Sequence, residues 1–222
     1  TEAVLFIQLG DGFKVGLLGL SSMVLPDENL KIASIQLAIM AYYDSQENMF
    51  LAQAGLTDQS WLFSETCRLT GGFALGTWFN TGDFVLSIGG YHPNFSKPSH
   101  YPLVDRLGFD WRLSDKITIK GGTYFTICSS AAMVGGSLDV AFKSGKLEAS
   151  FGTGINALVY FDPFKYEVDA YISVYASYGW FSATIGASIE IMGPKMRGIA
   201  EVEWTVLTFQ VKFGNWNTPP PD

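Results

Sequence analysis

Charged side chains are scarce in this sequence of 222 residues. Asp, Glu, Lys and Arg make up 16% of the chain, against ~25% in an average soluble domain, whereas apolar residues make up 48%. This apolar content excludes a disordered chain. So few charges leave part of the surface apolar, and we expect neighbouring chain, another protein or lipid to hide it.

Basic residues are fewer than acidic residues in this chain. The chain has 14 Lys and Arg against 21 Asp and Glu, which gives a formal net charge of -7. An acidic surface repels phosphate backbones, so the composition excludes nucleic acid as a partner.

Cysteine is nearly absent, and Cys67 and Cys128 match no zinc or redox spacing. We expect two buried free thiols, with a disulfide left open, and the low count favours a reducing compartment. Residues 1–16 lack the basic start of a secretory signal, and no run reaches the ~18 apolar residues of a membrane-spanning helix. These features favour the cytoplasm, although the start without Met leaves open that the chain is excised from a longer one.

Helix signals are also nearly absent. The one serious candidate is Leu30–Tyr42, whose apolar spacing fits a strand as well as a helix. Its content of Ile and Tyr favours a strand.

What the sequence does contain is a repeat. After Gly82, the alternate positions Phe84, Leu86 and Ile88 are apolar. The same series of a turn-forming residue and alternating apolar residues starts at Asn48, Asp115, Gly145 and Gly179, with a degenerate copy at Asp11. The copy at Asp115 is weaker than the others. These five copies start 30 to 34 residues apart, so we interpret them as structural repeats.

Each repeat predicts a β-hairpin. Gly, Asn and Asp tolerate the positive φ of a tight turn, and a period of two places the apolar side chains of a strand on one face. A unit of about 33 residues is then one hairpin plus a return. We therefore predict an all-β antiparallel meander of about a dozen strands, which is a curved sheet, a barrel or a sandwich. Residues 1–214 form one domain and residues 215–222 a Pro-rich tail.

The longest return, Tyr91–Val104, contains three prolines and both histidines of the chain. Its length and composition predict an ordered functional loop. The candidate interaction residues in and beside it are Tyr91, His92, Phe95, His100, Tyr101, Asp105 and Arg106.

Residues that could carry chemistry are few. A metal site built from His92, His100 and Asp105 is one interpretation, but we favour a loop anchor in which His92 is hydrogen-bonded to the backbone. No G-x-S-x-G elbow or phosphate-binding loop occurs. Glu201 and Glu203 alternate with apolar residues, which predicts the wet face of a sheet rather than a catalytic pair. We therefore predict no enzyme, and no catalytic, cofactor or metal residue.

Three segments carry a family resemblance: CRLTGGFALGTWFNTGDFVLSIGGYHP at 67–93, YFDPF at 160–164 and MGP at 192–194. Together they resemble a domain-of-unknown-function family, number 6603, found in large fungal and bacterial proteins. The resemblance spans about residues 12–214 and implies a repeated β domain within a larger protein, without an assigned activity. The short Gly-Trp-Phe link between Tyr178 and Ser182 departs from the family pattern and implies a tight turn.

Three functions remain open. The first is a structural or interaction module that meets protein partners, or copies of itself, through strand edges. The second is a groove for lipid or another apolar ligand. Small residues that could line such a groove are Gly89, Ala149, Gly152, Ala183 and Gly186. The third is a membrane-associated β-barrel, although the strands carry charges at alternate positions.

Overall fold

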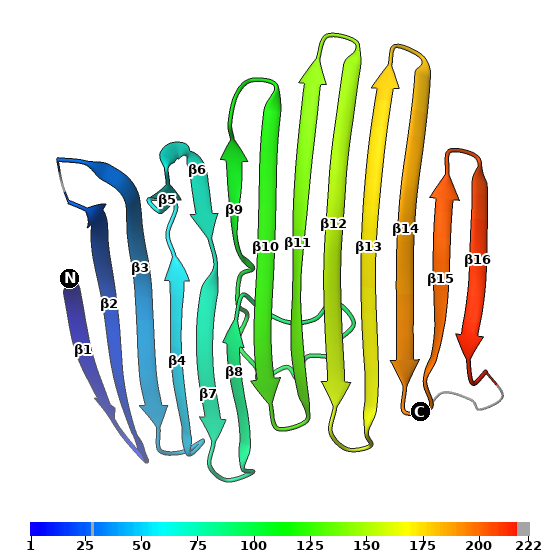
Figure 1. The fold of residues 1–222 in the computed structure, drawn as a ribbon. Helices are drawn as coiled ribbons and strands as arrows, with labels where there is room; N and C mark the ends of the chain where they lie inside the picture. Colours follow the sequence, from blue (N-terminus) through cyan, green and yellow to red (C-terminus); the bar gives the residue numbers. More distant parts are fainter. Residues whose placement is uncertain (28, 217–222) are drawn as a thin grey trace.

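The computed structural model describes residues 1–27 and 29–216 as one large antiparallel sheet (Figure 1). Sixteen strands belong to this sheet, and these residues include no helix. The predicted all-β meander is therefore confirmed. Most of the predicted tail at 215–222 lies outside the described residues.

The strands follow one another along the chain with short connections. They are β1 (Glu2–Leu9), β2 (Phe13–Pro26), β3 (Lys31–Asp44), β4 (Met49–Leu56), β5 (Trp61–Leu62), β6 (Ser64–Thr70), β7 (Gly72–Trp78), β8 (Asp83–Ile88), β9 (Leu107–Arg112), β10 (Ile117–Cys128), β11 (Ala131–Ser144), β12 (Leu147–Tyr160), β13 (Lys165–Tyr178), β14 (Phe181–Gly193), β15 (Arg197–Trp204) and β16 (Leu207–Gly214). The candidate helix at Leu30–Tyr42 is β3, as the Ile and Tyr content predicted.

Neighbouring strands pair in chain order except between β3 and β10. There the sheet is divided into two levels, because the intervening strands are too short to run the length of β3 or β10. One level contains β4, β7 and β8, and the other contains β5, β6 and β9 (Figure 1). The two levels complete a ring of eight strands that starts and ends at β3.

The turn residues of the predicted repeats all lie between paired strands. Gly82, Gly145 and Gly179 have φ values of 71°, 60° and 63°, which belong to the left-handed region that glycine tolerates best. Asn48, at φ 47°, makes the turn between β3 and β4. The hairpin repeat is thus confirmed, and the tight turn after Tyr178 with it.

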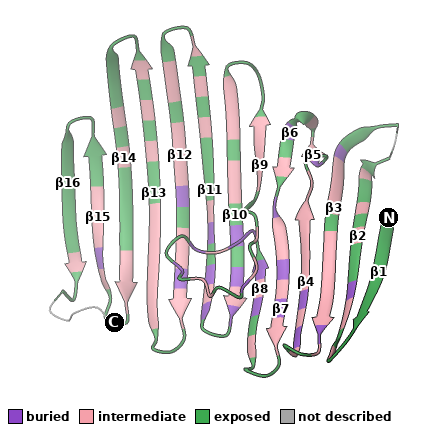
Figure 2. Cartoon of the chain, turned by 180° about the vertical axis from the view of Figure 1, so that it is seen from behind, coloured by how far each residue is buried: buried purple, intermediate pink, exposed green. Residues whose placement is uncertain are grey.

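The segment between β8 and β9, residues 89–106, runs across one face of the sheet over β10, β11 and β12 (Figure 2). We call this segment the strap. The buried apolar cluster lies beneath and within it, and consists of Val85, Phe95, Tyr101, Tyr124, Cys128, Ala131, Met133 and Leu158. Both cysteines are buried free thiols, as predicted.

The alternation of side chains gives the sheet two different sides. We call the side covered by the strap the strap face, to which Val85, Met133 and Leu158 point. The opposite side we call the apolar face. It receives the alternating residues of the repeats, such as Phe84, Leu86 and Ile88. In the described part of the chain, no helix has the length and hydropathy needed to cross a bilayer.

If the strap provides the core, truncating the buried aromatic ring of Phe95 should destabilise the protein. Phe95 is 9% exposed, so Phe95→Ala should lower the free energy of unfolding by about 3–5 kcal/mol. Leu103 belongs to the same strap but is 85% exposed, so Leu103→Ala should change it by less than about 0.5 kcal/mol. Denaturant unfolding of both variants measures the difference, and equal losses would contradict this account of the core.

Candidate functional site

The apolar face is open over the second half of the sheet. Within β11–β16, every large apolar side chain that is exposed, apart from Tyr171, points to this face. They are Val134, Leu138, Leu147, Ile155, Ile172, Val174, Tyr178, Phe181, Ile185, Ile189, Val202, Trp204, Leu207, Phe209 and Val211. Contiguous exposed apolar patches of this extent are rare on soluble monomers, so this face is the candidate functional site.

Outside the cluster that the strap covers, the strap face of the same strands is polar. Its charged side chains include Asp139, Asp169, Glu190, Glu201 and Glu203, which alternate with the apolar residues along the strands. Glu201 and Glu203 therefore lie on a wet face, as predicted, and Gln210 donates a hydrogen bond to Glu201. The charged side chains of β11–β16 thus lie on one side of the sheet.

A hollow of about 540 Å³ lies at the centre of the apolar face. Large and small side chains alternate across the strands that line it, because each large one faces a small one in the neighbouring strand. The large ones are Leu138, Ile155, Ile172 and Ile189, and the small ones are Gly136, Thr153, Ala170 and Ala187. The sequence indicated five other small residues as the lining of a groove, and none of them lines this hollow: Gly89, Ala149, Gly152, Ala183 and Gly186.

The two outermost strands of the sheet are β1 and β16, each paired on one side only among the described residues. Each carries a single charged side chain, Glu2 in β1 and Lys212 in β16. Edges with so little charge are open to pairing with another strand.

The predicted interaction loop lies on the other face, and its residues divide into two groups. His92, Phe95 and Tyr101 are buried and Tyr91 is half-buried, so these side chains hold the strap to the sheet. His100, Asp105 and Arg106 are exposed. Of the residues predicted to interact with a partner, only these three have side chains that a partner could reach, and their role stays a prediction.

One end of the strap is anchored at Asp83. The Tyr101 hydroxyl donates to Asp83 Oδ1 at 2.6 Å, and His100 Nε2 lies 2.7 Å from Asp83 Oδ2. The ring of Tyr101 stacks on Trp78 with centroids 5.5 Å apart. Burial acts to raise the pKa of the Asp83 carboxyl, but its hydrogen bonds with Ser129, Tyr101 and His100 outweigh burial and hold that pKa below its usual range.

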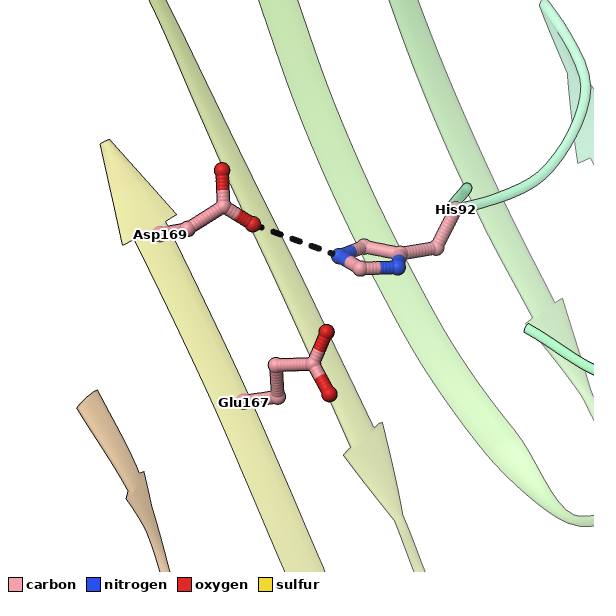
Figure 3. Close-up of side chains that lie close together, drawn as sticks. All are labelled: His92, Glu167 and Asp169. Atoms are coloured by element: carbon pink, nitrogen blue, oxygen red, sulfur yellow. Dashed lines mark ion pairs between the residues drawn. The ribbon is translucent and has the colours of Figure 1, made fainter. Parts of the chain in front are cut away.

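The other end is anchored at His92. Its Nδ1 accepts a hydrogen bond from the Asn94 backbone N–H at 3.1 Å, which confirms the predicted loop anchor. Its Nε2 is buried and has no hydrogen-bond partner in the part of the chain that the structure describes. This nitrogen points toward Asp169 and Glu167 of β13, and Asp169 Oδ1 is 3.9 Å away (Figure 3).

The structure does not bring together His92, His100 and Asp105, the alternative metal site that the sequence left as the less favoured interpretation. His100 pairs with Asp83, Asp105 is exposed, and His92 faces the two carboxylates of β13 instead. Burial lowers the pKa of His92 by more than those carboxylates raise it, so the ring is neutral at neutral pH. Sequence reasoning missed Glu167 and Asp169, whose signal is their position two residues apart in one strand.

Comparison with protein families gives a match over the whole chain. The model of a family described as "Family of unknown function (DUF6603)" matches residues 1–222. No curated protein and no solved structure matches the chain.

The anchor at Asp83 predicts a defined dependence on pH. Asp83→Asn should lower the free energy of unfolding at pH 7 by about 1–2 kcal/mol, because the charged acceptor of the hydrogen bonds from Tyr101 and Ser129 is lost. The pKa of the folded carboxyl is depressed, so its contribution is complete above the unfolded pKa of about 3.9 and disappears as the pH falls through the folded value.

Denaturant unfolding from pH 7 to pH 3 tests this, with exposed Asp139→Asn as the matched control. The difference between wild type and Asp83→Asn should shrink only at the acid end of the series. A difference that is the same at every pH would show that the charge of Asp83 contributes nothing.

Proposed function

The chain belongs to the DUF6603 family of unknown function, and we propose that it is a non-catalytic structural module that buries its apolar face against a second copy of itself. The observation that carries this proposal is the chemical difference between the two faces of β11–β16. One face presents charged and hydroxyl side chains to water, and the other presents a continuous apolar surface.

The size of the apolar face suits a stable dimer. The strands β11–β14 each contain 13 or 14 residues. At ~4.8 Å between strands and ~3.3 Å per residue, these four strands alone present about 900 Å². A standard interface buries about 800 Å² on each partner, so one block of the sheet is sufficient.

The relief of the face also suits another sheet. The small side chains of the hollow alternate with large side chains that protrude from the face. Of the protruding side chains, Ile155 is 55% exposed and Ile185 is 56% exposed. Two sheets that pack face to face lie about 10 Å apart, and the side chains of their inner faces interdigitate. In a symmetric pair, the same patch of each copy supplies both the protruding side chains and the hollow.

Charge favours the same arrangement. The chain has a net charge of -7, and the acidic side chains of β11–β16 point away from the apolar face. Face-to-face packing therefore keeps the acidic sides of the two copies apart. Within β11–β16, the basic side chains also point to the strap face, so an anionic lipid surface would meet no basic side chain on the apolar face of these strands.

The open edges support a second mode of self-association, in which β1 or β16 pairs with a strand of another copy. Edge pairing extends the sheet but leaves its apolar face uncovered. The two modes are therefore separable by substitutions on the face.

The test is the mass of the chain in solution, measured without detergent by light scattering. The wild type should have twice the mass of the 24.3 kDa chain. Ile189→Lys places a charge in the hollow and should weaken the dimer by about 100-fold or more. Ser188→Lys changes the adjacent residue of β14, which faces Glu201 on the strap face, and should leave the mass unchanged.

Circular dichroism and thermal unfolding establish that both variants fold. An Ile189→Lys variant that keeps the double mass would mean that edges rather than faces hold the copies together. A wild-type monomer would also overturn the proposal. If it carried extra mass that extracts into organic solvent, lipid would be the occupant of the face.

A further inference from the structure

We propose that His92, Glu167 and Asp169 form a binding site for a transition-metal ion of the Zn²⁺ class. The site lies on the strap face, so it is independent of the proposed dimer. One ligand comes from the strap and two come from β13, so the ion would fasten the strap to the sheet (Figure 3).

The three side chains are already close enough to share an ion. One ligand atom from each lies within 4.8 Å of the others. Ligands about 2.0–2.2 Å from a tetrahedral Zn²⁺ are about 3.4 Å apart. The 3.9 Å between His92 Nε2 and Asp169 Oδ1 is near that value, and the ligand atoms of all three side chains need to draw together only slightly to meet one ion.

The buried imidazole nitrogen is the observation that points to a ligand. The side chain of His92 is 1% exposed, and its Nε2 has no hydrogen-bond partner among the described residues. Nearly all buried polar atoms in proteins are satisfied by protein, water or an ion. Here the unsatisfied atom points at two carboxylates, whose negative charges favour a cation between them and the ring.

Polar neighbours hold the two carboxylates in place from behind. The Asn94 side chain donates to Glu167 Oε1, and the Asn156 side chain donates to Asp169 Oδ2 at 2.9 Å. Asn156 is itself fixed by the Tyr124 hydroxyl at 2.9 Å. One oxygen of each carboxylate is thus oriented by an amide, and the other remains available to the ion, as in known metal sites.

The Arg106 guanidinium does not replace the ion. It lies 4.0 Å from the centroid of the Tyr124 ring and donates to the Tyr91 carbonyl oxygen.

Coordination has a cost at the other ring nitrogen. Because Nδ1 accepts from the Asn94 N–H, the neutral ring carries its proton on Nε2. A metal at Nε2 moves this proton to Nδ1, and the Asn94 peptide must then turn away. One neutral hydrogen bond is worth about a factor of ten in an equilibrium constant, whereas Zn²⁺ bound by several protein ligands contributes many orders of magnitude.

The donor set selects the class of metal. An imidazole nitrogen with two carboxylates suits Zn²⁺ and its neighbours in the first transition series, whereas Mg²⁺ and Ca²⁺ prefer oxygen alone. Three protein ligands leave a fourth position for water. The ion would therefore be a clip with one exchangeable ligand.

The test is calorimetric titration of the full chain with ZnCl₂ after treatment with chelator. The wild type should bind one equivalent. Glu167→Gln and Asp169→Asn keep the shape of each side chain and should each weaken binding by about 10–100-fold or more. His100→Gln is the matched control, because that histidine pairs with Asp83 outside the site, and it should bind like the wild type.

Hydrogen exchange tests directly whether the bound ion fastens the strap to the sheet. Zn²⁺ should slow exchange of the amides of residues 91–104 in the wild type and in His100→Gln, but not in the Asp169→Asn variant. Absence of Zn²⁺ binding by the wild type would overturn the proposal. So would undiminished binding by Glu167→Gln and Asp169→Asn, or a preference for Mg²⁺ over Zn²⁺.

Discussion

A sheet one layer thick has two faces and cannot bury either of them by itself. Everything distinctive about this molecule follows from that constraint. The strap covers one face over β10–β12 and creates the buried cluster around Met133 and Leu158. On β13–β16 the strap face turns polar, so water covers it. Only the apolar face has no segment of the described chain over it and few polar side chains for water to solvate.

Local features of the fold could be predicted from the sequence because hairpins are made by residues that are near one another in the chain. The turns at Gly82, Gly145 and Gly179 and the alternation around them depend on a few neighbouring residues. The division into two levels between β3 and β10 could not be predicted. It depends on the pairing of β6 with β9, and these two strands are separated in the chain by β7, β8 and the strap.

The site illustrates the same limit more sharply. The sequence indicated His92 and the strap, because prolines and both histidines are concentrated there. It gave no partner for His92, since Glu167 and Asp169 reach that ring only after three further strands have been laid side by side. The aromatic side chains Phe95 and Tyr101 predict burial as readily as binding, and in the structure they are buried.

The strap also imposes an order of events on synthesis of the chain. A ribosome releases β8, then the strap, then β9 and the strands that the strap must lie on. The hairpins can form one after another as they emerge, because their contacts are local. Phe95, however, has no Tyr160 to pack on until β12 has been translated, and His92 must wait for β13. For that interval the nascent chain exposes an apolar segment beside unfinished strands, which is the state most vulnerable to aggregation and most suited to a chaperone.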